Sequence, residues 1–118
     1  MLRILSFNVR GLGGVLKKAE IRKLIAKEKV DLVCIQETKK VTIVKRLVES
    51  MWGHENVDWV YSGSTGASGG LLCMWNKVNF QKVDSWGEEG DLGVKGMWRG
   101  EEVDIVNVYA PCSDEKKE

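Results

Sequence analysis

The apolar run "VDLVCIQET" at residues 30–38 constrains the fold of this chain more than any other feature. A strand with one solvent-exposed face alternates apolar and polar residues, whereas the apolar residues of this run are nearly continuous. The pattern therefore predicts a strand that is buried on both faces. The run then ends in three polar residues, Gln36, Glu37 and Thr38.

A strand and a helix are expected before this run. Residues 2–8, "LRILSFN", have the composition of a buried strand that ends at Asn8. Residues 16–29 show the period of a helix, with three apolar residues on one face: Ile21, Leu24 and Ile25. If the two strands are parallel neighbours joined by this helix, their ends lie at the same edge of the sheet. Asn8 and Glu37 are then expected close together.

The second half of the chain changes from helical to strand-like patterns. A second helix is expected with Thr42 as its N-cap and Gly53 at its end. Its apolar face has four members: Val44, Leu47, Val48 and Met51. Turn residues then separate five expected strands at 57–63, 69–76, 78–86, 92–100 and 103–111. The pattern predicts one α+β domain over residues 1–118, with a mixed sheet, two helices and a disordered tail at 113–118.

Composition excludes some classes of protein and leaves others open. The net charge of +1 neither favours nor excludes a nucleic-acid partner, and the Lys- and Arg-rich segments 17–29 and 39–46 are typical of solvated helix faces. Three cysteines about 39 residues apart form no CxxC pair, which argues against a zinc site and a disulfide framework. Neither a membrane span nor a signal peptide is evident. We expect a soluble intracellular domain.

Polar side chains with related chemistry follow the first two strands and the last one. Asn8, Glu37 and Tyr109 supply an amide, a carboxylate and a phenol, which suit a Mg²⁺ ion and a phosphate group. Each residue also has a simpler interpretation. Asn8 can open a turn, Glu37 can be a capping or solvent-exposed acid, and Tyr109 can be an amphipathic aromatic residue at a strand end.

Four segments in this order, "ILSFNVRGLG", "DLVCIQETK", "SGSTGASGGLLCMWNK" and "VDIVNVYAP", resemble the endonuclease/exonuclease/phosphatase superfamily. Within it, the chain is most similar to the endonuclease domain of plant LINE-type (non-LTR) retrotransposons. The resemblance implies the N-terminal half of a four-layered α/β/β/α sandwich. It also implies hydrolysis of phosphodiesters with Mg²⁺ or Mn²⁺, DNA as partner and a nuclear location. In LINE elements this domain nicks chromosomal DNA.

The resemblance also assigns roles to individual residues. Asn8 matches an Asn that helps to hold metal and phosphate, Glu37 matches the metal-binding carboxylate, and Tyr109 matches a Tyr that contacts the scissile phosphate. The segment Ser68-Gly69-Gly70 is given a structural role only. Arg10 departs from the Asn or Asp of related repair endonucleases, which weakens an assignment to abasic-site cleavage.

The family's later motifs, Asp-x-Asn and Ser-Asp-His, have no counterpart in residues 1–118. The one histidine, His54, matches no catalytic position and is typical of a surface loop. We therefore expect a hydrolase by ancestry that is inactive as this fragment. The alternatives are a non-catalytic nucleic-acid-binding module and an inert retroelement relic. Half a sandwich would also leave an inner sheet face partly bare and so favour self-association, through residues such as Leu72, Met74, Val106 and Val108.

Overall fold

The structure is a computed structural model that describes residues 1–66, 69–88 and 90–109. Its elements, in chain order, are β1 (Ile4–Asn8), α1 (Val15–Glu28), β2 (Leu32–Gln36), α2 (Lys45–Trp52), β3 (Val57–Ser62), β4 (Leu71–Asn76), β5 (Phe80–Glu88), β6 (Asp91–Trp98) and β7 (Glu101–Val108). The expected tail at 113–118 and the end of the last expected strand lie outside the described residues. No helix in the described part of the chain is both long and apolar enough to span a membrane.

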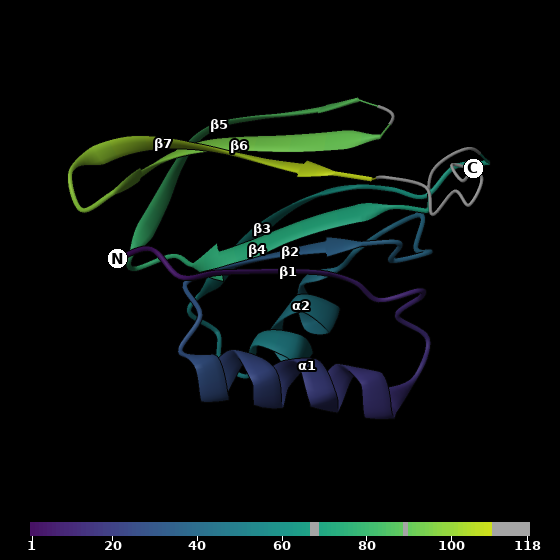
Figure 1. Ribbon diagram of the computed structural model, residues 1–118. Coiled ribbons are helices and arrows are strands. Elements are labelled where there is room, and N and C mark those ends of the chain that lie inside the picture. Colours follow the sequence, from purple (N-terminus) through teal and green to yellow (C-terminus); the bar gives the residue numbers. More distant parts are fainter. Residues whose placement is uncertain (67–68, 89, 110–118) are drawn as a thin grey trace, which may run out of the picture.

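The described elements form three layers (Figure 1). Strands β1, β2, β4 and β3 form a four-stranded sheet in that order, and β5, β6 and β7 form a three-stranded sheet. Both helices cover one face of the first sheet, and the second sheet covers its other face. The first sheet is mixed, because β1 and β2 are parallel while β4 runs antiparallel to both β2 and β3. The expectation of an α+β fold with a mixed sheet and two helices is confirmed.

The β1–α1–β2 unit has the predicted parallel arrangement. Asn8 lies opposite Gln36 in the register, so the carboxyl ends of β1 and β2 meet at one edge of the sheet. Ile21 and Ile25 of α1 are buried against this sheet, as their helical spacing predicts. Leu32, the first residue of β2, is buried like the three residues after it, which confirms a strand covered on both faces.

Alternate residues of the first sheet face two different apolar cores. Toward the helices the sheet presents Val33, Ile35, Leu72 and Met74. Toward the second sheet it presents Leu32, Cys34, Leu71, Cys73 and Trp75, which pack against Phe80, Leu92, Val94 and Trp98. The ring of Phe80 meets that of Trp75 edge to face, with centroids 5.5 Å apart. The second sheet is therefore packed onto the first through a closed apolar layer.

The expectation that Leu72, Met74, Val106 and Val108 form a partly bare inner face is wrong. Leu72 and Met74 are fully buried, because their position in β4 directs them to the helices. Val106 and Val108 are about half exposed, at 52% and 55%. They lie on the outer face of β7, since the buried Asn107 between them points into the molecule.

Thr42 is not the N-cap of α2, so that prediction is wrong. The helix begins at Lys45, with Val44 in an extended conformation at the cap position and no side-chain cap. Ile43 is buried in the core, and Thr42 lies before it, three residues ahead of the first helical residue. The predicted end is confirmed, because Gly53 caps α2 in the left-handed conformation.

Candidate metal and phosphate site

The side chains of Asn8 and Glu37 meet at the edge where β1 and β2 end. Asn8 Nδ2 donates a hydrogen bond to Glu37 Oε2 at 2.9 Å. Asn8 Oδ1 accepts a bond from the backbone N–H of Arg10 at 2.9 Å, so the amide is oriented by both of its polar atoms. Asn8 does open a turn, as its simpler interpretation holds, but it also orients a carboxylate.

The backbone of Glu37 is held in an unusual conformation. Its φ is +58°, in the left-handed region that residues other than glycine enter at a cost of about 1–3 kcal/mol. Arg10 and Lys39 have φ values of +55° and +56° beside it. The turn after β1 holds Glu37 in place, because the backbone N–H of Gly11 donates a hydrogen bond to the carbonyl of Glu37 at 2.7 Å. Such strain persists where the surrounding structure determines the position of the residue, and it clusters at functional sites.

Two glycines close the other side of the Glu37 segment. A Cβ atom on Gly69 would lie 3.1 Å from Glu37 Cγ, and one on Gly70 would collide with Thr38 Oγ1. Gly70 has a φ of +94°, and its carbonyl accepts from Thr38 N at 3.2 Å. These contacts are those of a structural element that positions Glu37. Ser68 lies outside the described residues.

A buried amide that sequence reasoning did not assign to the site links the two sheets behind Glu37. Asn107 of β7 is 2% exposed and donates from Nδ2 to the carbonyls of Ile35 and Leu72, both at 3.1 Å. Its Oδ1 accepts from Gln36 Nε2 at 2.8 Å. A polar residue inside a strand pattern is the only signal in the sequence that could have indicated this role.

Tyr109 lies just beyond β7, which ends at the same edge of the molecule as β1 and β2 (Figure 1). Its ring is half-buried against the core between the sheets, and its backbone N–H donates to Gly90 O at 2.9 Å. Within the described residues, the phenol makes no hydrogen bond with Asn8 or Glu37. The structure thus brings Asn8 and Glu37 into contact and places Tyr109 at their edge without a contact between them.

The chemistry of this donor set fits a weakly held hard cation. Glu37 is half-buried, and its Oε1 has no hydrogen-bond donor among the described residues. One carboxylate oxygen suits Mg²⁺, which keeps several waters and takes few protein ligands. No group of three or more His, Cys, Asp or Glu side chains that could hold a metal lies within residues 1–66, 69–88 and 90–109. Among the described residues, Glu37 would therefore hold such an ion, with Asn8 orienting its carboxylate.

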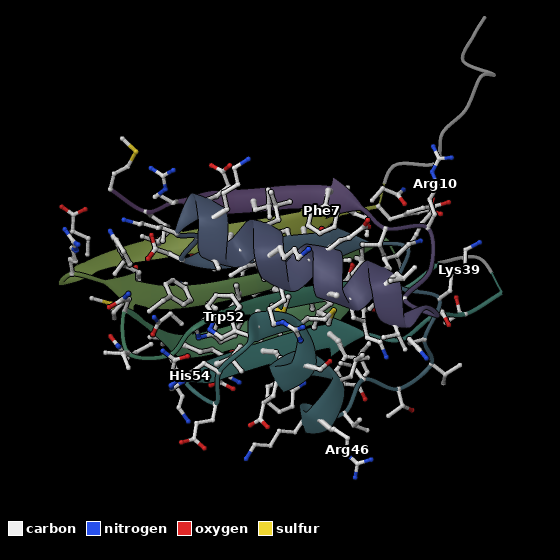
Figure 2. All side chains as sticks on the ribbon, turned by 90° about the horizontal axis from the view of Figure 1, so that it is seen from below. Phe7, Arg10, Lys39, Arg46, Trp52 and His54 are labelled. Carbon is white, nitrogen blue, oxygen red and sulfur yellow. The ribbon has the colours of Figure 1, made fainter. Side chains whose placement is uncertain are left out.

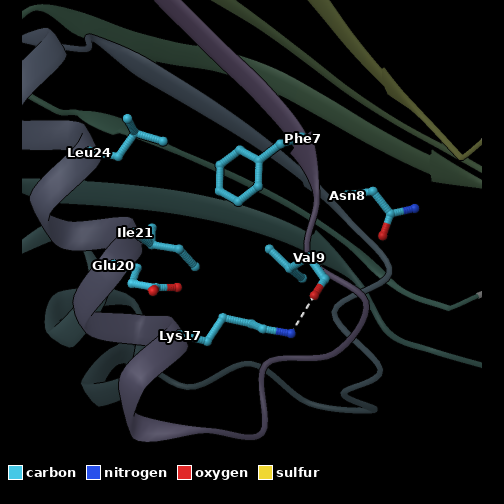
Figure 3. A pocket seen from close by; sticks show the side chains of 7 residues that line it. All are labelled: Phe7, Asn8, Val9, Lys17, Glu20, Ile21 and Leu24. Atoms are coloured by element: carbon cyan, nitrogen blue, oxygen red, sulfur yellow. Dashed lines mark hydrogen bonds between the residues drawn. The ribbon is translucent and has the colours of Figure 1, made fainter.

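A basic hollow of about 400 Å³ adjoins this edge. It is formed by the glycine-rich turn Gly11–Gly14 together with Arg10, Lys17, Lys39 and Lys40. In the described part of the chain, none of these four cations forms a salt bridge. The side chain of Lys17 is fixed by donating to the carbonyl of Val9 at 2.7 Å (Figure 3). The hollow has the charge expected of a surface that binds phosphate groups.

A second hollow beside Asn8 has different chemistry. It measures about 250 Å³ and lies between β1 and α1, where Phe7, Ile21 and Leu24 line it (Figure 3). The side chain of Asn8 points away from α1 in this view. Asn8, Lys17 and Glu20 also line this hollow, so it borders the Asn8–Glu37 pair on the side of α1.

His54 lies far from the candidate site. It follows α2, and the next strand, β3, begins opposite the end of β4 and therefore at the edge where β2 starts. Figure 2 shows His54 and Arg10 at opposite ends of the molecule. The imidazole Nδ1 of His54 accepts from the backbone N–H of Asn56 at 3.0 Å, as in an ordinary loop turn.

Comparison with known proteins identifies related folds. The family model described as "Endonuclease/Exonuclease/phosphatase family" matches residues 5–113. None of the curated proteins matches this sequence. An AP endonuclease from Leishmania major is similar in structure, with a TM-score of 0.68 and 20% identity over 92% of this chain and 40% of its own. The endonuclease domain of the telomere-specific non-LTR retrotransposon TRAS1 has a TM-score of 0.64 and 18% identity, over 93% of this chain and 45% of its own.

A third similar structure, TDP2 from D. rerio in complex with a single-stranded DNA product, has a TM-score of 0.67 and 15% identity. That match covers 98% of this chain and 49% of the TDP2 chain. The chain thus spans less than half the length of each of these three structures. At such identities the structural likeness establishes the fold, while the family match covers most of the sequence. The chain belongs to the endonuclease/exonuclease/phosphatase family.

Proposed function

We propose that this chain carries the cation- and phosphate-binding part of a phosphodiesterase that acts on DNA. The observation that carries the proposal is the hydrogen bond of 2.9 Å between Asn8 and Glu37, made by two side chains from neighbouring parallel strands. Glu37 would hold Mg²⁺ or Mn²⁺, which polarises a phosphate oxygen when bound. Asn8 would orient the carboxylate, and the phenol of Tyr109 would donate a hydrogen bond to the phosphate.

These residues would bind the metal and the phosphate, whereas the remaining catalytic groups would be supplied elsewhere. Hydrolysis needs a base for the attacking water, and such assistance is worth about 10²–10⁴-fold. The one histidine of the sequence, His54, lies at the opposite end of the molecule from Arg10 (Figure 2). Catalytic groups that act as a unit fail together when one is missing. We therefore expect these 118 residues by themselves to bind DNA with little or no cleavage.

The basic hollow supports DNA as the partner. The Asn8–Glu37 pair is adjoined by four cations: Arg10, Lys17, Lys39 and Lys40. A DNA strand with a phosphate near Glu37 would therefore pass over these cations. Contacts of this kind give affinity that falls steeply with salt and is largely independent of sequence. The four segments that resemble the superfamily support an origin in a LINE-type retrotransposon, and a nuclear location would follow from that origin.

The second candidate is a non-catalytic nucleic-acid-binding module. The same four cations favour it, because they require no chemistry at Glu37. The two candidates differ in how they depend on divalent cation. If the chain binds DNA only through contacts between its cations and the DNA phosphates, the effect of divalent cation on affinity is the same with and without the Glu37 carboxylate. If it binds through the proposed metal site, that effect is lost with Glu37.

Two measurements on the same samples test the proposal. Nicking of supercoiled plasmid is measured with Mg²⁺, with Mn²⁺ and with chelator, and affinity for a labelled oligonucleotide is measured by fluorescence anisotropy under the same conditions. The variants are Glu37→Gln and, as a matched control, Glu101→Gln, which removes an exposed carboxylate at the far end of β7.

The expected result is DNA binding that strengthens with divalent cation in the wild type and in Glu101→Gln. That cation dependence should be lost in Glu37→Gln, with no more than background nicking in any sample. Equal cation dependence in Glu37→Gln would refute the metal site. Metal-dependent nicking that Glu37→Gln abolishes would show that the residues present are sufficient for catalysis.

A further inference from the structure

Cys34 of β2 and Cys73 of β4 lie directly opposite each other in the register of the first sheet. Their Sγ atoms are 3.9 Å apart, and both residues are free cysteines. Both are buried between the two sheets, at 4% and 0% exposure. The two thiols therefore touch in the core between the sheets.

The ladder of hydrogen bonds defines the geometry of this pair. Asn76 N donates to Asp31 O, so the opposing residues 31 and 76 form a hydrogen-bonded pair. Such pairs alternate along antiparallel strands, and Cys34 and Cys73 are three positions further on. They therefore form a non-hydrogen-bonded pair, in which Cα atoms are about 4.5 Å apart and side chains approach most closely. That separation is at the short end of the range that a disulfide spans.

The two thiols also differ in acidity. A hydrogen bond with Cys73 lowers the pKa of Cys34. The same bond and burial raise the pKa of Cys73 above its usual range. Either sulfur can donate the hydrogen bond between them, so a thiolate on one cysteine is stabilised by the thiol of the other.

We propose that Cys34 and Cys73 close a reversible disulfide across β2 and β4 when a small peroxide oxidises them. The Cys34 thiolate attacks a peroxide oxygen, the O–O bond breaks, and Cys34 becomes a sulfenic acid. The Cys73 sulfur then attacks the Cys34 sulfur, the S–O bond breaks, and water leaves with the proton of the Cys73 thiol. With hydrogen peroxide, two thiols give one disulfide and two waters, and the two electrons from sulfur reduce the peroxide.

The position of this bond relates it to the candidate site. Glu37 follows β2 by one residue, and Gly69 and Gly70 precede β4 directly. The disulfide would connect the two strands whose ends bracket Glu37. Closure would restrain their separation while leaving the Asn8–Glu37 contact in place, since no residue of that contact takes part.

The experiment uses the full chain in a Cys112→Ser background, so that Cys34 and Cys73 are the only thiols. Folded protein is treated with hydrogen peroxide, then denatured in N-ethylmaleimide, and its intact mass is measured. The expected product has lost two hydrogen atoms, carries no maleimide, and returns to the doubly modifiable form after dithiothreitol. Its near-UV circular dichroism should match that of the reduced protein.

A urea-unfolded sample and a Cys34→Ala variant in the same background are the controls. The unfolded sample shows that the peroxide is active, and the variant shows whether any lost modification comes from bonds between chains. The proposal is overturned if folded protein still takes two maleimides while unfolded protein forms the bond. It is equally overturned if the products are sulfinic acids, or if the disulfide forms only with loss of the near-UV signal.

Discussion

Replacing Asn107 with alanine should destabilise the packing of the two sheets far more than replacing an exposed asparagine. The side chain makes three hydrogen bonds, two buried ones to carbonyls of β2 and β4 and a partly buried one with Gln36. A net hydrogen bond contributes about 1 kcal/mol, which sets an upper figure of about 3 kcal/mol. Ile35 and Leu72 face each other as a hydrogen-bonded pair of the ladder, so their carbonyls keep a partner each.

The amide of Gln36 also keeps other partners after the substitution, so the loss at each of the former partners is partial. That amide retains Ser6 Oγ at 3.1 Å and Cys34 O at 3.4 Å as acceptors. Against this, the substitution leaves a small cavity at a site that is 2% exposed. We expect the free energy of unfolding to fall by about 2–3 kcal/mol, which corresponds to a fall in Tm of roughly 8–12 °C for a domain of this size.

Urea unfolding followed by tryptophan fluorescence measures this loss. The midpoint should move to lower urea at an unchanged m-value, which indicates a change in stability alone. Asn76→Ala is the matched control, because its side chain accepts one exposed hydrogen bond, from Val78 N at 2.9 Å. Its cost should stay below about 1 kcal/mol. If Asn107→Ala costs no more than Asn76→Ala, apolar contacts alone hold the sheets together and the role given to Asn107 is wrong.

Two further substitutions test the surroundings of Glu37. Gly70→Ala should lower the free energy of unfolding by about 2–3 kcal/mol, because φ is +94° and the added methyl collides with a packed side chain. Gly66→Ala is the control, since the space around it is open, and it should change that free energy by less than about 0.5 kcal/mol. Equal costs would remove the structural role of Gly70. The double variant Lys39→Ala/Lys40→Ala should weaken oligonucleotide binding and reduce the slope of log K against log [salt] by up to about 1.8, while Lys82→Ala on β5 should leave both unchanged. An unchanged slope in the double variant would move the DNA path away from the basic hollow.

The first part of the fold could be predicted because its patterns are unambiguous. A helix of clear period lies between two apolar strands, and parallel pairing then brings Asn8 and Glu37 to one edge without further information. The sequence pattern could not predict the backbone conformation and the contacts that hold Glu37 in position. The left-handed backbone of Glu37 and its contact with Gly69 depend on segments far apart in the sequence.

The wrong orientations predicted for Leu72 and Met74 of β4 and for Val106 and Val108 of β7 have a common physical cause. Residues 71–75 of β4 are all apolar, so nothing in the sequence indicates which of them face the helices and which face the second sheet. In β7 the alternation that would orient the strand is reversed, with Val106 outside and Asn107 inside. A polar residue can be buried when its hydrogen bonds are made by a partner strand, and only the three-dimensional register shows that partner.

The most direct test of the central claim is a titration of Mn²⁺ binding followed by electron paramagnetic resonance of the free ion. Wild-type protein and Glu101→Gln should remove the free Mn²⁺ signal to the same extent as protein concentration rises, because the Asn8–Glu37 pair is intact in both. Glu37→Gln keeps an oxygen for Asn8 to bond but removes the charge, and it should leave the free signal nearly undiminished. If Glu37→Gln binds Mn²⁺ as wild type does, the edge formed by β1 and β2 is not the metal site, and the proposed function fails with it.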